Sequence, residues 1–168
     1  MNALNVRIVE LRPLRVASFH AYGQEPEVAA WGKLAAWAKS KGFLEDIKSH
    51  QVFGFNNPSP SPGSPNYGYE LWITVGPEVE AEEEMEIKEF AGGLYAVACC
   101  QVSGKPYETI PAGWKQLVLW REDSAYKPGG HQWLEEHIHL DRYPQGEWDL
   151  DLYLPIEESD QEEVISKK

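Results

Sequence analysis

The feature that most constrains the fold is a phrase that occurs twice. The pattern Trp-x-x-Leu-x-x-Trp stands at residues 31–37 and again at residues 114–120. The copies are 114 − 31 = 83 residues apart in a chain of 168, which is half of its length. Spacings of three and six residues place both Trp and the Leu on one side of a helix. The chain therefore predicts a duplicated unit, in which each half has one helix with an aromatic stripe to bury.

The same order of elements surrounds both predicted helices. The first helix opens at residues 24–27, where Pro26 suits the first turn, and ends at Gly42; the second runs from about Pro111 to about Glu122. Gly92-Gly93 indicates a turn between the strands on either side of it. An order of β-α-β-β, repeated, predicts an α+β fold whose halves share one antiparallel sheet system. Strands are expected at residues 4–10, 14–22, 51–56, 67–75, 84–90, 94–102, 131–140 and 147–156.

Length predicts a single domain over residues 1–156, with halves at about 1–77 and 84–156. An acidic tail, residues 157–168, is expected to fray. The Pro- and Ser-rich segment 57–66 has no pattern of regular structure and is either a lid or a spacer. The beginning of the chain has no signal-peptide pattern, and no apolar run is long enough to span a membrane. Because Cys99 and Cys100 are adjacent and cannot pair, we expect reduced thiols and a cytoplasmic protein.

The charge of the chain is strongly negative and uneven. The formal net charge is −12, and residues 78–89 alone carry seven Glu against one Lys. This acidity argues against direct binding of a nucleic-acid backbone. The segment 78–89 is either a solvated linker or a surface for a basic protein partner, and charge runs are more often solvated.

One predicted strand, at residues 131–140, has an unusual face. Period-two alternation puts Leu134, Ile138 and Leu140 on the side that we expect the helices to cover. The other side then carries an acid and two imidazoles beside an aromatic ring. A carboxylate among aromatic rings suits a delocalised or quaternary cation, and burial would raise its pKa. The alternative is a wet sheet face with Trp at its edge. The residues of this side are Trp133, Glu135, His137 and His139.

Other strands supply further aromatic side chains for such a pocket. The candidates are Phe53, Phe55, Trp72, Tyr95 and Trp148. No metal site is predicted, because strand residues four apart lie about 13 Å from each other, too far for Glu135 and His139 to ligate one ion. No cofactor is predicted either.

Several segments together resemble the GyrI-like small-molecule-binding superfamily, which includes the effector domains of AraC- and MerR-type multidrug regulators. The resemblance implies a pseudo-two-fold pair of β-α-β-β units, a central ligand cleft, and a buried Glu that meets planar cations. By its place in the pattern this Glu matches Glu135, and His137 departs from the aromatic residue of the family. The adjacent Glu136 is the alternative, although it shares a face with Leu134. The segments are 17–23, 31–37, 69–75, 91–97, 114–117, 134–137 and 148–156.

Three functions follow from the resemblance. The first is binding or sequestration of small hydrophobic, often cationic or aromatic molecules, without an attached DNA-binding motif. The second is hydrolysis of strained electrophiles such as cyclopropane-bearing compounds, with Glu135 as the catalytic residue that activates water. The third is binding of a protein partner, because relatives of this family inhibit DNA gyrase.

Overall fold

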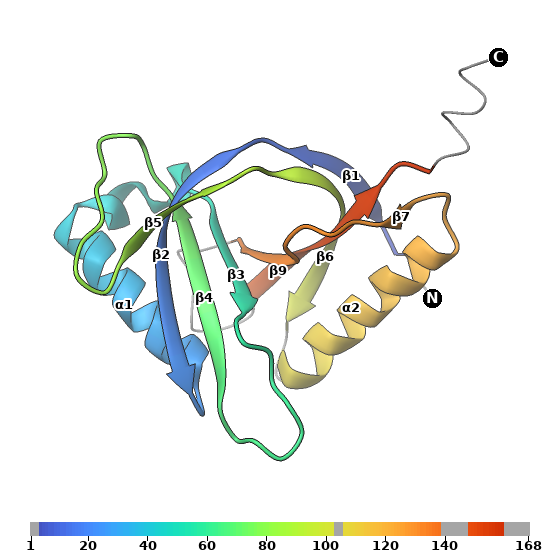
Figure 1. Cartoon of the computed structure of the whole chain (residues 1–168), viewed down its shortest axis with the longest axis horizontal. Coiled ribbons are helices and arrows are strands. Elements are labelled where there is room, and N and C mark those ends of the chain that lie inside the picture. Colours follow the sequence, from blue (N-terminus) through green and yellow to red (C-terminus); the bar gives the residue numbers. More distant parts are fainter. Residues whose placement is uncertain (1–3, 103–105, 139–147, 160–168) are drawn as a thin grey trace.

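The computed structural model describes residues 4–102, 106–138 and 148–159 (Figure 1). Within these residues, one nine-stranded sheet and two α-helices make up most of the fold. The first half contains β1 (Val6–Leu11), β2 (Leu14–Gly23), α1 (Pro26–Ser40), the 3-10 helix η1 (Phe43–Ser49), β3 (Val52–Asn56) and β4 (Tyr67–Thr74). The second half contains β5 (Glu86–Phe90), β6 (Gly93–Val102), α2 (Pro106–Glu122), β7 (Lys127–Pro128), β8 (Leu134–His137) and β9 (Trp148–Glu157).

The sheet confirms the duplicated α+β fold. Its strand order is β1-β6-β9-β8-β3-β4-β2-β5, with β7 paired to β9, and every pairing is antiparallel. The order is symmetric about the junction of β8 and β3, so each of the eight strands along this path has a counterpart on the other side of the junction. The two halves therefore meet at β3 and β8, which pair Gly54 with Glu135.

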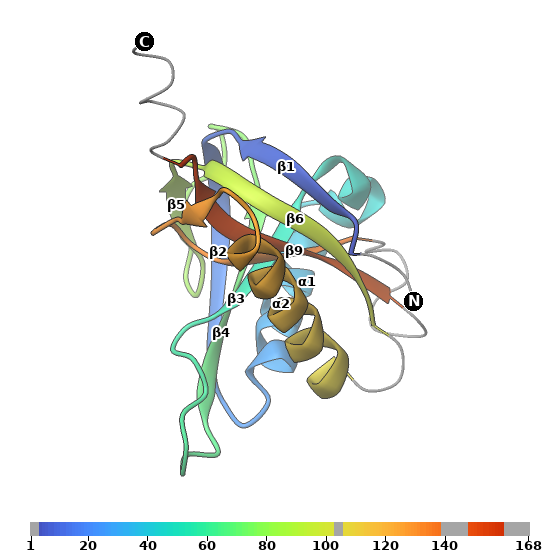
Figure 2. The ribbon, with the colours of Figure 1, turned by 90° about the vertical axis from the view of Figure 1, so that its right-hand side faces the viewer.

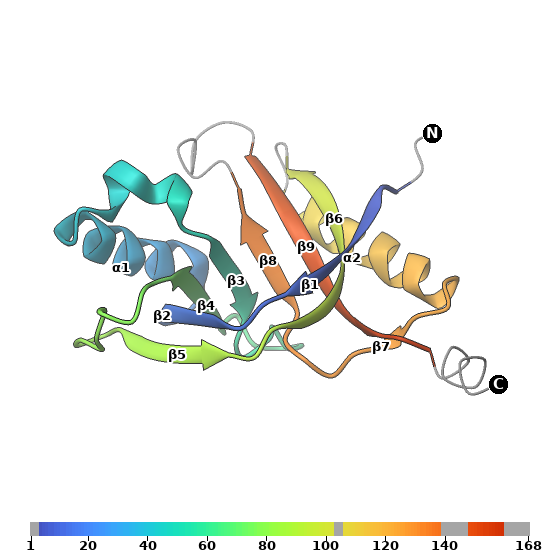
Figure 3. The same ribbon diagram turned by 90° about the horizontal axis from the view of Figure 1, so that it is seen from above.

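The predicted turn at Gly92-Gly93 is wrong. Strands β5 and β6 do not pair with each other; they form one bent ribbon that pairs with β2 and β1, and Leu11 stands opposite Gly93. A Cβ atom at Gly92 would collide with the carbonyl oxygen of Leu11, and its φ of 79° is left-handed. The ribbon of β5 and β6 therefore bends at Gly92, where it passes from β2 to β1. Together with β1 and β2 it forms the arch seen in Figures 1 and 3.

Each helix covers the sheet strands of its own half, as Figure 2 also shows for α2 beside β6 and β9. Leu34 of α1 and Leu117 of α2, the central residues of the repeated phrase, are both buried. The cluster beneath α1 includes Phe19 and Leu71, and the cluster beneath α2 includes Leu150, Leu152, Leu154 and Ile156 of β9. The stripes therefore serve as scaffold, as the duplication predicts.

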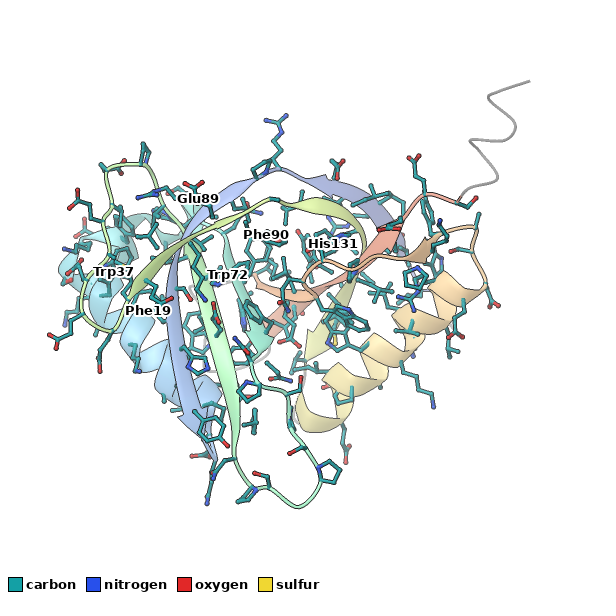
Figure 4. All side chains as sticks on the ribbon, in the orientation of Figure 1. Phe19, Trp37, Trp72, Glu89, Phe90 and His131 are labelled. Carbon is teal, nitrogen blue, oxygen red and sulfur yellow. The ribbon has the colours of Figure 1, made fainter. Side chains whose placement is uncertain are left out.

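A third hydrophobic cluster lies on the opposite face of the sheet, beneath the arch. Its members include Phe53, Trp72, Tyr95, Leu134 and Tyr153. Figure 4 shows Trp72 and Phe90 there, with ring centroids 5.3 Å apart. The prediction that Leu134 faces the helices is wrong: both faces of β8 are covered, and its apolar side fills the space under the arch.

Some boundaries differ from those predicted. Helix α2 begins five residues before the predicted start at Pro111, which lies inside the helix. Strand β8 has four residues, and His139, Leu140 and the tail from residue 160 lie outside the described part of the chain. The helix beginning at Pro26 is confirmed. Of the helices that the structure describes, neither is long and apolar enough to span a membrane.

Candidate functional site

A pocket of about 420 Å³ opens on the helix-covered face, where the two halves of the sheet meet. We call it the Glu135 pocket. Its walls come from β3, from the loop that follows it, from α2 and from the segment leading into β8. The lining residues are Gly54, Phe55, Asn56, Ser59, Trp114, Gln132, Trp133 and Glu135. Ser59 belongs to the predicted loop 57–66, so this loop forms part of the pocket wall.

The carboxylate of Glu135 is held by two neutral donors. The indole N–H of Trp114 donates to Oε2 at 3.2 Å, and the hydroxyl of Tyr69 donates to Oε1 at 3.0 Å. Burial raises the pKa of Glu135, and these two hydrogen bonds oppose the increase. Among the described residues, no Lys or Arg forms an ion pair with this carboxylate. The pocket therefore holds a carboxylate that no cationic side chain of the described residues balances.

A short polar chain extends behind Glu135. The hydroxyl of Tyr69 also lies 3.1 Å from Nε2 of His137, whose ring meets the edge of Trp31 with centroids 5.1 Å apart. Burial lowers the pKa of His137 to about 3, so its imidazole is neutral at ordinary pH. With Glu135 ionised, Tyr69 donates to the carboxylate and His137 Nε2–H donates to Tyr69. If Glu135 takes a proton, it can donate to Tyr69, and Tyr69 can donate to Nε2 of His137 when the imidazole is in the tautomer with its proton on Nδ1.

Aromatic rings form the more open side of the pocket. Trp114 and Trp133 lie with ring centroids 5.1 Å apart and planes inclined by 42°. Trp133 remains 41% exposed, which is high for so large an apolar ring. The rim adds the polar side chains of Asn56, Ser59 and Gln132. The pocket thus offers an aromatic surface at its mouth and a carboxylate at its base.

The structure brings together only some of the predicted site residues. Glu135, Trp133 and Phe55 line the pocket, and His137 lies behind it against Tyr69. Phe53, Trp72 and Tyr95 instead lie in the cluster under the arch, because alternation turns them to the opposite face of their strands. Phe55 shares that face with Phe53, and its ring lies against Trp72 with centroids 4.8 Å apart, although the residue also borders the pocket. The side chain of Trp148 lies outside the described part of the structure.

The same alternation separates Glu135 from Glu136, the alternative candidate for the pocket carboxylate. Glu136 faces the arch side, where the hydroxyl of Tyr153 donates to it at 2.7 Å. It does not line the Glu135 pocket. The structure therefore places Glu135 on the side of the helices and Glu136 on the side of the arch.

Sequence reasoning misses two neighbours of Glu135. The repeated phrase indicates that Trp114 packs on the sheet together with Leu117 and Trp120. In the structure Trp114 lies at the edge of this packed surface and borders the pocket. Tyr69 stands out in the sequence only as part of a strand that repeats. Neither the repeat nor the alternation indicates that the side chain of Tyr69 on β4 reaches over β3 to Glu135 on β8.

A second cavity, of about 530 Å³, lies at the edge of the sheet near β2 and β5. At its base, Glu70 is buried and receives hydrogen bonds from Ser18, Trp72 and Lys88 on one oxygen and from Asn57 on the other. Burial pushes its pKa up, but the four hydrogen bonds outweigh burial, and the pKa lies below its usual value. This carboxylate is fully satisfied by the protein, which distinguishes it from Glu135.

No group of three His, Cys, Asp or Glu side chains with the arrangement of a metal site occurs within residues 4–102, 106–138 and 148–159. His139, which shares a predicted strand face with Glu135 and His137, lies outside these ranges.

Known proteins match the chain over most of its length. The family described as GyrI-like small molecule binding domain matches residues 4–157. A relative from Escherichia fergusonii named DNA gyrase inhibitor is 26% identical over 160 residues, which cover 91% of this chain and 98% of that protein.

Solved structures share the fold at low sequence identity. The C-terminal domain of EcmrR has a TM-score of 0.66 and 15% identity, over 92% of this chain and 98% of that domain. In the EcmrR–DNA complex the TM-score is 0.67 at 14% identity, over 92% of this chain, which spans 57% of the length of that EcmrR chain. SAV2435, solved bound to tetraphenylphosphonium, has a TM-score of 0.50 and 11% identity, over 92% of this chain and 94% of that protein.

Proposed function

The chain belongs to the GyrI-like small molecule binding domain family, and on that premise we propose that it binds lipophilic, aromatic cations in the Glu135 pocket. The observation that carries the proposal is a desolvated carboxylate without a cationic partner in the described structure, placed below two Trp rings. Aromatic faces attract cations, and a delocalised cation loses little hydration when it is buried. SAV2435, a structural neighbour, was solved with such a cation.

Binding of a cation would also relieve an electrostatic cost. Burial disfavours the ionised form of Glu135, so the free pocket raises the pKa of this side chain. A cation beside the carboxylate would favour ionisation and lower that pKa. We therefore expect affinity for permanently charged cations to rise with pH through the raised pKa of Glu135, and affinity for neutral aromatic ligands to change little.

Titration with a fluorescent cationic dye tests the proposal. Glu135→Gln keeps the shape of the side chain, removes its charge, and is expected to weaken binding at least about tenfold. Glu136→Gln is the matched control, because it makes the same change one residue away on the opposite face. Equal affinities of wild type and Glu135→Gln for the dye would contradict the role of Glu135 as counter-charge.

Turnover is the second candidate, favoured by the hydrogen-bonded chain of Glu135, Tyr69 and His137. A carboxylate with a raised pKa is suited to take a proton from water and return it to a carbon atom as a strained ring opens. Mass spectrometry of a cyclopropane-bearing electrophile incubated with the protein would detect addition of one water molecule. Binding without this mass change would leave only the first role.

A protein partner is the third candidate, because the relative from Escherichia fergusonii carries the name DNA gyrase inhibitor. The acidic segment 78–89 is the surface that we would test first. A gyrase supercoiling assay with the wild type and a variant lacking residues 80–84 would separate the cases. Inhibition that is unchanged in the variant would exclude this segment as the contact.

A further inference from the structure

A second carboxylate stands near Glu135 on the same side of the sheet. Glu27 lies in the first turn of α1, and each of its oxygens is 2.7 Å from the hydroxyl of Tyr67. Tyr67 and Tyr69 are two residues apart on β4, so their side chains share a face and stand about 7 Å apart. The hydroxyl of Tyr69 meets Glu135. Two neighbouring Tyr side chains of one strand therefore each hold a carboxylate.

Glu27 lies at the N-terminal end of α1 and is not among the residues that line the Glu135 pocket. The N-terminal ends of α1 and α2 lie closer together than their C-terminal ends (Figures 1 and 3). Glu27 is thus at the end of α1 that is nearer to α2, and Trp114 of α2 lines the Glu135 pocket. The side chain of Glu27 is half-buried, so one side of it remains open to solvent.

The two carboxylates are electrostatically coupled. The negative charge of Glu27 adds a small increase to the pKa of Glu135, beyond the larger effect of burial. Neither carboxylate forms an ion pair with Lys or Arg in the part of the chain that the structure describes. A negative side chain in the first turn of a helix is favourable by itself, which accounts for Glu27 as a local feature. The helix terminus does not explain why Glu135 is held in the same way by Tyr69, the next residue on the same face of β4.

We propose that Glu27 is a specificity-determining residue, and that the site prefers elongated dications over monocations. The inner cationic group would lie at Glu135 and the outer one at Glu27. The two Tyr side chains that hold these carboxylates stand roughly 7 Å apart on β4. This inference rests on the proposed function, because it extends the same site by one anionic position.

Competition binding with two matched series of cations tests the inference. The first series consists of bis-quaternary ammonium alkanes of increasing spacer length, and the second of mono-quaternary ammonium alkanes of equal chain length. Each compound displaces a fluorescent monocationic dye. Wild type is expected to show an affinity optimum at one spacer length of the dications, about tenfold above the matched monocation. The monocations should show only a smooth increase with chain length.

Three variants separate the specific role from general effects of charge. Glu27→Gln should lose the optimum and about tenfold in affinity for the best dication, with monocation affinity within about twofold of wild type. Glu25→Gln is the control, because it removes one acidic charge two positions away on an exposed side chain. Tyr67→Phe keeps the charge of Glu27 but removes its hydrogen bond, and should broaden the optimum. Thermal unfolding of each variant confirms that it is folded.

Two results would overturn the inference. One is an optimum that persists in Glu27→Gln, and the other is an equal loss for monocations and dications in that variant. Failure of the wild type to bind the dye or any monocation would overturn the proposed function itself. The dye and monocation measurements therefore distinguish a failure of the site from a failure of its second anionic position.

Discussion

The side chain of Tyr69 passes over Gly54 so closely that a Cβ atom at position 54 would collide with the phenol hydroxyl. Strand β3 lies between β4, which carries Tyr69, and β8, which carries Glu135. The absence of a side chain at Gly54 therefore lets the hydroxyl of Tyr69 cross β3 and reach Glu135. A glycine at the junction of the two halves is what connects the first half of the chain to the carboxylate of the second.

We expect Gly54→Ala to displace Tyr69 and break its hydrogen bonds to Glu135 and His137. The added methyl group should lower the free energy of unfolding by about 1–3 kcal/mol. Denaturant unfolding measures this loss, and dye titration measures the accompanying loss of affinity. Gly32→Ala in α1 is the control, because a Cβ placed there meets no atom within 4 Å apart from its chain neighbours and the backbone of its own helix. That variant should be stabilised by about 0.5–1 kcal/mol. Equal stability of Gly54→Ala and wild type would show that Tyr69 does not need the space.

Trp114→Phe tests the indole hydrogen bond to Glu135. The change keeps an aromatic ring at the pocket and removes the N–H donor, so the pKa of Glu135 should rise further and cation affinity at neutral pH should fall several-fold. Trp120→Phe is the matched control in the same helix, because Trp120 stacks on Tyr126 away from the pocket. A loss of affinity in Trp120→Phe equal to that in Trp114→Phe would point to general weakening of α2 instead.

How much of this arrangement the sequence predicts depends on the type of pattern. The repeated Trp-x-x-Leu-x-x-Trp predicts both helices and the two-fold relation, because helical spacing and duplication are local and visible. Alternation places Glu135 and His137 together and separates Glu136 from them, and the structure places them so. Alternation alone does not indicate that Leu134 faces the arch, because both sides of β8 are covered.

The remaining parts depend on contacts between strands that are distant in sequence. Trp72 and Tyr95 are candidates for the pocket in the sequence, but which face of each strand forms the pocket depends on how the arch folds over the sheet. The bend at Gly92 looks like a hairpin turn in the sequence, and only the pairing of β1 with β6 shows that it is a bend. The contact of Trp114 with Glu135 likewise depends on the packing of α2 against the second half of the sheet.

Glu135→Gln should increase stability at neutral pH. Burial raises the pKa of Glu135 above 4.5, so the folded protein disfavours the ionised side chain. The wild type therefore loses stability as the pH rises above about 4.5, and the loss is complete above the folded-state pKa. The variant avoids this loss, which is about 1.4 kcal/mol for each unit by which folding raises the pKa of Glu135. Thermal unfolding over a pH series should show no difference at low pH and a more stable variant at pH 7. A less stable variant at pH 7 would contradict the direction in which burial moves the pKa.

Glu70→Gln should have the opposite effect, although Glu70 is also buried. Its pKa lies below 4.5, because four donors, among them Lys88, hold the ionised form and together outweigh burial. The stability that this carboxylate contributes is therefore present above pH 4.5 and is lost as the pH falls through its folded-state pKa. An amide cannot accept hydrogen bonds at both ends and carries no charge for Lys88, so the variant should be less stable at pH 7 by about 1.5–3 kcal/mol. The difference should shrink as the solution is acidified. Because Glu135→Gln and Glu70→Gln make the same chemical change, unfolding curves that shift in the same direction would show that the partners of each carboxylate do not decide its contribution.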